Sequence, residues 1–450
     1  SGCSPGVCSA SPVTVFDDQD LSANLGRKVL IIENGDWGGT CTHRGCIPTK
    51  ALLACSRRYQ ELKTWKRLGV SAENTAFDFG TVRRHQAQMV KVSALGVRKS
   101  LQDLGVDCAD GEAAILAPGD VAVTLPTGAT ERKSGNNIVI SWGSEVTPLP
   151  SVPFSRRVIS SDTLLQMETL PASLIVIGGG AIGVEFATFL AEIGVKVTLI
   201  ELMAHILPYE DEDVADLLTG ELKKKGIDIH TAASVLEVVE ADENVALRAS
   251  RGDQSLQVAA ECVLVSTGRR PRLRRAELDR LGIVYSDRGI VVDSSLQTSV
   301  PGIFAVGDVT GGMLLAHRAA AQGRTVSRFL FADPAAQHSD DAVPAVVYSH
   351  PPVSRVGLTE EKARQLGLDI VVRKKEYGTN IIARTELMGN GFIKTLFHKD
   401  CLVGAVIVGE QAPDLITALS LAIASGMTDR DLSSWIIPHP TLSELLDLHH

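Results

Sequence analysis

The sequence has few cysteines, no long apolar run and no excess of positive charge. Eight cysteines in 450 residues are too few for a disulfide scaffold, which favours a reducing compartment with one disulfide kept for chemistry. The most apolar stretch, residues 174–200, is interrupted by Glu185, Glu192 and Lys196, so no membrane span is predicted. A formal net charge of −9 argues against a general binder of nucleic acid or anionic membranes.

The first residues also lack the charged start and apolar core of a signal peptide. We therefore expect a cytoplasmic location, or an organelle matrix in a eukaryotic source. A chain of 450 residues is too long for a single hydrophobic core and predicts two to four domains.

Residues 38–50 bring reactive residue types together, in the order Gly-Gly-Thr-Cys-Thr-His-Arg-Gly-Cys-Ile-Pro-Thr-Lys. If Pro48 lies in the first turn of a helix, where its missing N–H costs nothing, Lys50 shares a face with Cys46. A cation beside Cys41 and Cys46 favours the reactive thiolate. The alternatives are a passive disulfide or half of a metal site, but further ligands at short spacing do not follow. We interpret the stretch as a redox device.

The stretch closely resembles the redox-active site of the flavin-dependent disulfide reductases, the family of lipoamide dehydrogenase, glutathione reductase and mercuric reductase. The similarity runs from about residue 27 to about residue 446. It implies an α/β fold with two doubly wound, Rossmann-like domains and a C-terminal α+β dimerisation domain. The expected limits are 1–147 for the FAD-binding domain, 148–275 for the NAD-binding domain, 276–343 for a central domain completing the FAD site, and 344–450 for the dimerisation domain.

The N-terminal residues fit this family poorly. Gly2–Val7 resembles a damaged G-x-G-x-x-G fingerprint, in which a serine and a valine replace the second and third glycines. The strand expected before such a turn is missing, and Gly2 precedes Glu33 by 31 residues, where the fingerprint expects about 20. We expect Val13–Leu21, with its acidic turn at residues 17–20, to be an insert.

Two acidic residues are predicted to hold FAD. Glu33 ends a buried strand over residues 29–33 and is placed to hydrogen-bond a ribose. Residues 303–308 resemble the family's second flavin motif, which implies that Asp308 holds ribityl hydroxyls; a helix cap is the alternative. Trp142 departs from the family's Ala-Thr-Gly strand end, and nothing in the sequence explains it. The resemblance places these residues around the flavin: Gly2, Glu33, Gly39, Thr40, Lys50, Gly143, Asp308, Leu315 and Ala316.

A second, intact fingerprint predicts the NAD site. Residues 174–183 form an apolar strand, a glycine-rich turn and a helix start, and Glu201 follows 23 residues after Gly178. Glu201 would bind the adenosine ribose and repel a 2′-phosphate, and residues 202–206 supply no arginine, which favours NAD over NADP. A tight turn that binds nothing is the alternative. The NAD-binding residues are expected to be Gly178, Gly180, Ile182, Gly183, Glu201 and Gly268.

Glu185 lies unusually close to this turn for an acid beside a phosphate. In the family the matching glutamate pairs with the lysine after the redox cysteines, so the resemblance implies a pair between Glu185 and Lys50. The alternative is a solvated helix residue.

The C-terminal part should form the dimerisation domain. Residues 344–397 and 402–408 alternate as an antiparallel sheet does, and residues 414–425 and 428–435 read as helices. In the stretch His439-Pro440-Thr441-Leu442-Ser443-Glu444, Thr441 and Glu444 fit a helix capping box. The family uses the same stretch as a base, with His439 held by Glu444 and reaching across the dimer to the redox disulfide. Both roles are compatible.

These patterns favour a homodimeric dihydrolipoamide dehydrogenase that uses FAD and NAD. Cys41, Cys46, Lys50, Glu185, His439 and Glu444 would be catalytic, and the partner would be a lipoyl-carrying protein of a 2-oxoacid dehydrogenase or glycine cleavage complex. A glutathione-type reductase, a non-catalytic structural subunit and an enzyme that binds FAD weakly remain alternatives. Mercuric reductases are disfavoured because the C-terminal cysteine pair is lacking.

Overall fold

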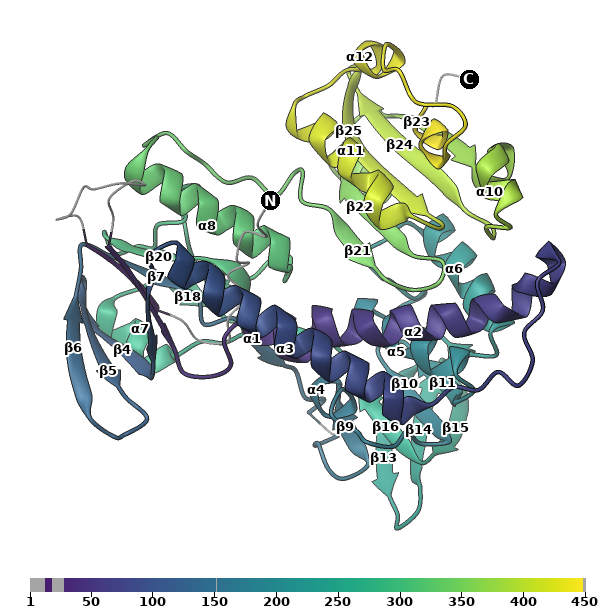
Figure 1. The fold of residues 1–450 in the computed structure, drawn as a ribbon, viewed down its shortest axis with the longest axis horizontal. Helices are drawn as coiled ribbons and strands as arrows, with labels where there is room; N and C mark the ends of the chain where they lie inside the picture. The colour runs from purple at the N-terminus through teal and green to yellow at the C-terminus, as the bar shows by residue number, and fades with distance from the viewer. Residues whose placement is uncertain (1–12, 18–27, 151, 448–450) are drawn as a thin grey trace. The chain divides into compact units, whose positions relative to one another are not determined.

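The computed structural model describes residues 13–17, 28–150 and 152–447, and the chain divides into two compact units. Unit 1 comprises residues 1–51, 81–147 and 269–339, and unit 2 comprises residues 52–80, 148–268 and 340–450. The chain therefore passes between the units several times, as its colour shows in Figure 1. Within the described ranges, no helix has the length and apolarity that crossing a bilayer requires.

A five-stranded sheet forms the centre of unit 1, in the order β20-β7-β1-β2-β3. β2 and β3 are parallel, as are β20 and β7, whereas β1 runs antiparallel to both of its neighbours. The strands are β1 (Val13–Asp17), β2 (Lys28–Glu33), β3 (Asp107–Asp110), β7 (Asn137–Ile140) and β20 (Ile303–Ala305).

β1 corrects one prediction. Residues 13–17 are not an insert, because they occupy the central position of this sheet, with Val13 opposite Ile32 on one side and Ile140 on the other. The facing edges of β2 and β7 carry N–H and C=O groups that need partners, and the sequence Val-Thr-Val-Phe has high strand propensity. Residues 13–17 thus fill the position between β2 and β7, antiparallel to both strands.

Two layers cover this sheet. α8 packs on one face through a cluster that includes Val139, Phe304 and Val326, and a three-stranded meander closes the other face (Figure 1). The remaining strands of unit 1 are β4 (Glu112–Ala117), β5 (Asp120–Thr124), β6 (Thr130–Ser134), β8 (Ser144–Val146), β17 (Arg269–Pro271), β18 (Tyr285–Ser286) and β19 (Gly289–Ile290). Its helices include α1 (Gly39–Arg44), α3 (Phe79–Asp103), α7 (Arg275–Leu281), η2 (Gly307–Thr310) and α8 (Ala316–Phe331).

Unit 2 contains a doubly wound nucleotide-binding sheet, as predicted. All its neighbouring strands are parallel, in the order β12-β11-β10-β16-β9. The strands are β9 (Val158–Ser160), β10 (Ser173–Ile177), β11 (Lys196–Ile200), β12 (Asp228–His230) and β16 (Cys262–Val265). Around it lie α2 (Cys46–Trp65, from Leu52 onward), η1 (Lys66–Leu68), α4 (Ser161–Leu164), α5 (Ala181–Glu192), α6 (Glu212–Lys224) and the meander β13 (Ser234–Glu240), β14 (Val245–Arg251) and β15 (Gln254–Ala260).

The predicted C-terminal antiparallel sheet is also present in unit 2, in the order β21-β22-β25-β24-β23. Helix α11 lies across β22 and β25, and its apolar residues fill the core beneath it (Figure 1). The elements are β21 (Ala345–Val347), β22 (Val353–Gly357), α9 (Glu360–Gln365), β23 (Val371–Glu376), η3 (Tyr377–Thr379), α10 (Ile381–Thr385), β24 (Phe392–His398), β25 (Cys401–Val408), α11 (Ala412–Ala424), α12 (Asp429–Ser433) and η4 (Leu442–Leu446).

Candidate functional site

The two cysteines of the redox stretch lie on consecutive helices. Cys41 is in the short helix α1, and Cys46 is the first residue of α2. Gly45 joins them, and a Cβ at this position would lie 2.9 Å from the carbonyl oxygen of Thr40, so a side chain would push the helices apart. Both cysteines are partly exposed.

The helical position of Lys50 matches the prediction. Pro48 is buried and lies in the first turn of α2, and Lys50 follows Cys46 by one turn on the same face. The unpaired N–H groups of a helix N-terminus carry partial positive charge, and Cys46 lies at this end of α2.

A group of side chains that the sequence did not single out supports this stretch. Trp37 Nε1 donates to Asp110 Oδ1 at 2.5 Å, and the guanidinium of Arg98 lies 5.2 Å from the centre of the Trp37 ring. His43 Nε2 lies 3.0 Å from the carbonyl oxygen of Trp37. Trp37, directly before Gly38 and Gly39, was the available signal in the sequence. Arg98 and Asp110, which contact its side chain, lie more than 60 residues further along the chain.

At the end of β2, Glu33 is 2% exposed, and its Oε1 accepts a hydrogen bond from Gly35 N–H at 2.9 Å. Burial raises the pKa of this carboxyl group, and the hydrogen bonds from the backbone oppose that effect. A buried acceptor at a strand end suits a ribose hydroxyl. Gly2, the other predicted contact at this edge, lies outside the described residues.

Asp308 lies in η2, directly after β20. Burial raises the pKa of its carboxyl group, while a hydrogen bond from Ser144 Oγ to Oδ2, 2.6 Å long, and the charge of Arg269 act in the opposite direction. Gly143, just before Ser144, has a φ of +71°, which favours glycine. Helix α8 begins at Ala316 with Leu315 as its N-cap residue.

The structure accounts for Trp142. Its side chain is fully buried in the hydrophobic core of unit 1, among residues such as Ile115, Ile138 and Leu278. The guanidinium of Arg274 lies 5.0 Å from the ring centre. Its Nε1 has no hydrogen-bond partner among the described residues. The tryptophan thus serves core packing.

The second glycine turn has the geometry of a dinucleotide site. Gly178 has a φ of +105°, Gly180 is the N-cap residue of α5, and Ile182 lies in the first turn. A Cβ at Gly183 would lie 1.9 Å from the carbonyl oxygen of Gly178, so only glycine allows this contact between helix and turn. The free N–H groups at the start of α5 can bind a pyrophosphate.

Glu201 orders this turn. Its Oε2 accepts a hydrogen bond from Gly179 N–H at 2.5 Å, and its Oε1 accepts one from Met203 N–H at 2.7 Å. Each carboxylate oxygen retains a further lone pair, so a ribose hydroxyl can still donate to it. Gly268, exposed and with a φ of +120°, follows β16, the neighbouring strand of the same sheet.

Two buried carboxylates lie seven residues apart on one face of α5. Glu185 is 6% exposed, and its Oε1 accepts a hydrogen bond from Tyr348 N–H at 2.9 Å. It is therefore no solvated helix residue. Its pairing with Lys50 stays a prediction.

The second carboxylate, Glu192, was missed by sequence reasoning. It is 2% exposed, and its carboxylate makes hydrogen bonds with Ser56 Oγ at 2.7 Å, Lys225 Nζ at 2.9 Å and His350 Nδ1 at 2.8 Å. Burial alone would raise its pKa, but these partners outweigh burial, and the pKa is lowered. The network connects α2, α5 and the loop after β21.

The C-terminal motif contains both the capping box and a contact between His439 and Glu444. His439 Nδ1 lies 2.8 Å from Glu444 Oε1, and Thr441 N–H donates to Glu444 Oε2 at 3.0 Å, so one carboxylate caps η4 and contacts the imidazole. These contacts, first from His439 and then from Thr441, lower the pKa of Glu444. The His439 side chain is 75% exposed.

Asn380 and Lys375 hold this motif from the neighbouring strand and helix. Asn380 Nδ2 donates to the carbonyl oxygen of Thr441 at 3.0 Å, while its Oδ1 caps α10. Lys375 Nζ donates to the carbonyl oxygens of Glu444 and Asp447, at 3.1 and 2.7 Å. Neither residue was recognised from the sequence, because the motif lies more than 60 residues further along the chain.

One group of three carboxylates among the described residues has the spacing of a metal site: Asp211, Asp213 and Glu360. The ammonium group of Lys394, 1% exposed, already lies 3.0, 2.8 and 2.6 Å from their oxygens. The cluster is therefore an internal salt bridge, in which the lysine supplies the cation.

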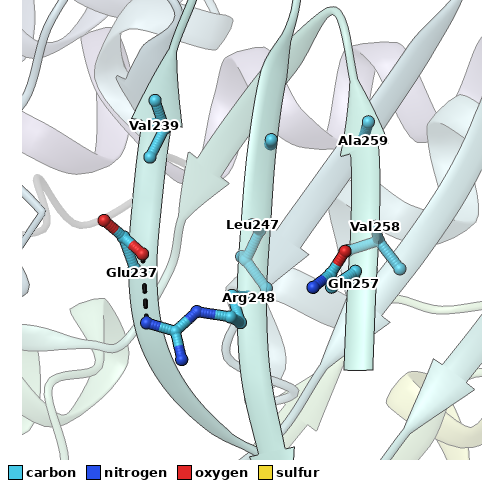
Figure 2. A pocket seen from close by; sticks show the side chains of 8 residues that line it. Glu237, Val239, Leu247, Arg248, Gln257, Val258 and Ala259 are labelled. Carbon is cyan, nitrogen blue, oxygen red and sulfur yellow. Dashed lines mark hydrogen bonds and ion pairs between the residues drawn. The ribbon is translucent and has the colours of Figure 1, made fainter. Parts of the chain in front are cut away.

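A shallow pocket lies on the meander of unit 2. Figure 2 shows its lining on β13, β14 and β15, with an ion pair of 3.1 Å between Arg248 and Glu237. It contains none of the predicted site residues and no cysteine or histidine. The pocket is not the redox site.

Comparisons with known proteins agree with this geometry. Residues 19–323 match the family model described as pyridine nucleotide-disulphide oxidoreductase, and residues 343–449 match the model of its dimerisation domain. The chain belongs to the pyridine nucleotide-disulphide oxidoreductase family. The family prediction, the fold class and the use of FAD and NAD are thereby confirmed, and the chain is an FAD-dependent, NAD-linked disulfide oxidoreductase.

Several members of the pyridine nucleotide-disulphide oxidoreductase family cover nearly the whole chain. Dihydrolipoyl dehydrogenases of Geobacillus stearothermophilus and Bacillus subtilis are 36% and 37% identical, over 94% of this chain and 90% and 91% of theirs. Among solved structures, LpdA of Mycobacterium tuberculosis has a TM-score of 0.86 at 25% identity, covering 94% of this chain and 93% of its own. A Cu(II) complex of the HOCl-induced flavoprotein disulfide reductase RclA of Escherichia coli has a TM-score of 0.81 at 30% identity, covering 93% and 92%.

Proposed function

We propose that this oxidoreductase is a dihydrolipoyl dehydrogenase, which oxidises the dihydrolipoyl groups of a lipoyl-carrying protein of a 2-oxoacid dehydrogenase or glycine cleavage complex. The observation that carries the proposal is the contact of 2.8 Å between His439 and Glu444. A histidine held by a carboxylate is a base for a thiol proton. The similarity to the two dihydrolipoyl dehydrogenases supports the same substrate class.

The protonation of this pair follows from its partners. The lowered pKa of Glu444 keeps it ionised near neutral pH, and an ionised carboxylate only accepts hydrogen bonds. His439 Nδ1 therefore carries the hydrogen, and Nε2 can take a proton from the substrate. The exposure of His439 leaves it accessible to a second copy of the chain, so in the proposed homodimer it serves the partner subunit's cysteines.

The thiol chemistry is an exchange of disulfides. His439 takes the proton of one substrate thiol, the thiolate attacks Cys41, and the Cys41–Cys46 disulfide breaks with Cys46 leaving as a thiolate. The second substrate thiol then loses its proton and displaces Cys41, which closes the cyclic disulfide of the product. The cysteine pair is now reduced by two electrons, and Lys50 and the N-terminus of α2 stabilise the charge at Cys46. Glu185 would hold Lys50 in place.

FAD, when bound, carries these two electrons from the cysteine pair to NAD. The residues that would hold FAD are Gly2, Glu33, Gly39, Thr40, Lys50, Gly143, Asp308, Leu315 and Ala316. Those that would hold NAD are Gly178, Gly180, Ile182, Gly183, Glu201 and Gly268. We further propose that the domains end after residues 147, 275 and 343. The proposed location is a reducing compartment such as the cytoplasm.

An anaerobic absorption spectrum, before and after about two electrons of dihydrolipoamide per subunit, tests the proposal. Flavin bands that give way to a long-wavelength band, followed by turnover with NAD, are the expected result. Flavin bands without the long-wavelength band would mean that the cysteines are not coupled to the flavin. If glutathione reduces the protein and dihydrolipoamide does not, the proposed substrate class is wrong. A colourless protein that does not take up FAD would refute the enzymatic role.

A further inference from the structure

Two hydrogen bonds in series hold the carboxylate of Asp308. Arg269 Nε lies 2.9 Å from Ser144 Oγ, which in turn lies 2.6 Å from Asp308 Oδ2. An arginine nitrogen only donates, and a serine hydroxyl has a single hydrogen. Arg269 therefore donates to Ser144, and Ser144 donates to Asp308.

The backbone fixes the two donors of this chain. Ser144 begins β8 and Arg269 begins β17, and these strands pair antiparallel. Arg269 Nη2 also donates to the carbonyl oxygen of Ser144, at 3.0 Å, so the guanidinium binds both the hydroxyl and the backbone of this one residue. Ser144 is 1% exposed, which removes water as a competing partner.

The loop that carries Asp308 is held from the other side as well. Gln322, 1% exposed, accepts a hydrogen bond from Gly307 N–H at 2.6 Å, and Arg318 donates to the carbonyl oxygen of Gly311 at 2.8 Å. Among the described residues, none donates a hydrogen bond to Asp308 Oδ1. One oxygen of the carboxylate is thus fixed, and the other remains available to a ligand.

We propose that Ser144, held by hydrogen bonds from Arg269, is a positioning residue. It orients Asp308 so that Oδ1 can accept hydrogen bonds from the ribityl hydroxyls of FAD. The inference rests on the proposed flavin role of Asp308. A carboxylate held in place before binding loses no rotamer freedom when the ligand arrives. An ionised acceptor also makes the stronger hydrogen bond, and Ser144 and Arg269 oppose the burial that raises the pKa of Asp308.

The test compares S144A with S295A in the full chain. Ser295 Oγ also donates to a carboxylate of unit 1, Asp293 Oδ1, at the same distance of 2.6 Å, but at a place the flavin site does not include. FAD is titrated into each apoprotein and binding is followed by flavin fluorescence. We expect S144A to weaken FAD binding by about tenfold, because a bond to a charged acceptor is lost, and S295A to bind as the wild type does.

The pH dependence separates positioning from general destabilisation. FAD binding should weaken as the pH falls through the pKa of Asp308, and S144A should move that fall to higher pH, because it removes a group that lowers this pKa. In a D308N background, S144A should cause no further loss of FAD affinity. If S144A does not fold, R269Q, which keeps the hydroxyl, is expected to show a smaller loss in the same direction.

Each contrary result overturns a distinct statement. If D308N weakens FAD binding and S144A does not, the inference is wrong and the flavin role of Asp308 stands. Equal losses in S144A and S295A would also overturn it, since they would report stability alone. If D308N binds FAD as the wild type does, both the inference and the flavin role of Asp308 fail.

Discussion

Trp142 shows how one residue can leave a family pattern without reaching the functional site. Its indole N–H is buried and has no partner among the described residues, which costs about 1–3 kcal/mol. Phenylalanine would remove this donor and keep most of the ring volume. We therefore expect W142F to change the free energy of unfolding by less than about 1 kcal/mol, or to raise it.

Urea unfolding of W142F, W142A and the wild type measures this effect. W142A should lose about 3–5 kcal/mol, because it leaves a large cavity in the core. A loss in W142F as large as that in W142A would mean that the indole N–H does have a partner.

Glu444 carries a second prediction at the residue scale. In the proposed mechanism, E444Q removes the charge that holds the Nδ1 hydrogen of His439 and that stabilises the imidazolium formed when Nε2 takes a proton. Oxidation of dihydrolipoamide should slow by about 10²-fold or more, while the flavin spectrum of the oxidised enzyme stays unchanged. Stopped-flow reduction by the dithiol measures the step directly.

A matched control exists in the same unit. Asp431 accepts hydrogen bonds from Thr428 in a capping box at the start of α12, without a histidine. D431N removes the charge from the same kind of cap and should leave the rate unaltered. A loss in D431N equal to that in E444Q would assign the effect to helix capping.

At the scale of the elements, α5 connects a glycine turn at its start with a buried carboxylate, Glu192, at its end. Its N-terminal turn belongs to the proposed dinucleotide site, and its C-terminal residue Glu192 binds Ser56, Lys225 and His350. This buried carboxylate has three donors, and two of them can carry positive charge. Loss of its negative charge therefore costs free energy of folding. The second half of α2 is thereby fixed to the nucleotide-binding helix.

Removal of this carboxylate should destabilise unit 2. We expect E192A to lower the free energy of unfolding by about 3–5 kcal/mol, because Ser56, Lys225 and His350 lose the buried carboxylate that they share. E61Q removes an exposed pair with Arg57 on the same α2, 46% exposed on each side, and should cost less than about 1 kcal/mol. Urea unfolding of both variants measures the difference, and equal midpoints would contradict it.

The sign of the pH dependence follows from the lowered pKa of Glu192. A carboxyl group whose folded pKa lies below its unfolded value contributes stability above the unfolded value, about 4.3. That contribution is lost as the pH falls through the folded pKa. E192A should therefore unfold with less dependence on pH on the acid side than the wild type.

At the scale of the whole molecule, β1 decides whether unit 1 has a continuous sheet. Val15 pairs with Leu30 and Ile138 on the two neighbouring strands. Proline supplies no N–H and does not fit a central strand, so V15P should open the sheet at its middle. We expect V15P to retain less FAD and to lose hydrogen-exchange protection in β2 and β7, with β10 and β16 still protected.

The reverse pattern serves as the control. V372P lies in β23, an edge strand of the C-terminal sheet in unit 2, and should leave β2, β7 and FAD binding intact. Unchanged protection of β2 and β7 in V15P would place residues 13–17 outside the sheet.

The sequence by itself determined those parts of the protein whose chemistry lies within one contiguous segment. Pro48, Cys46 and Lys50 share the first turns of one helix, and the turn from Gly178 to Gly183 requires glycine by its own backbone geometry. The contact of His439 with Glu444 spans five residues. Chain connectivity limits where such groups can lie, so spacing and residue type suffice.

Tertiary structure alone decided the rest. Ser144 reaches Asp308 across 164 residues and Glu192 meets His350 across 158, and neither spacing carries information about the contact. The direction of β1 depends on which strand edges were left without partners, and the burial of Trp142 depends on the space beneath the sheet. Hydrogen bonds and packing between distant segments are selected by the assembled fold, because only there does a buried polar group or a cavity incur its cost in free energy.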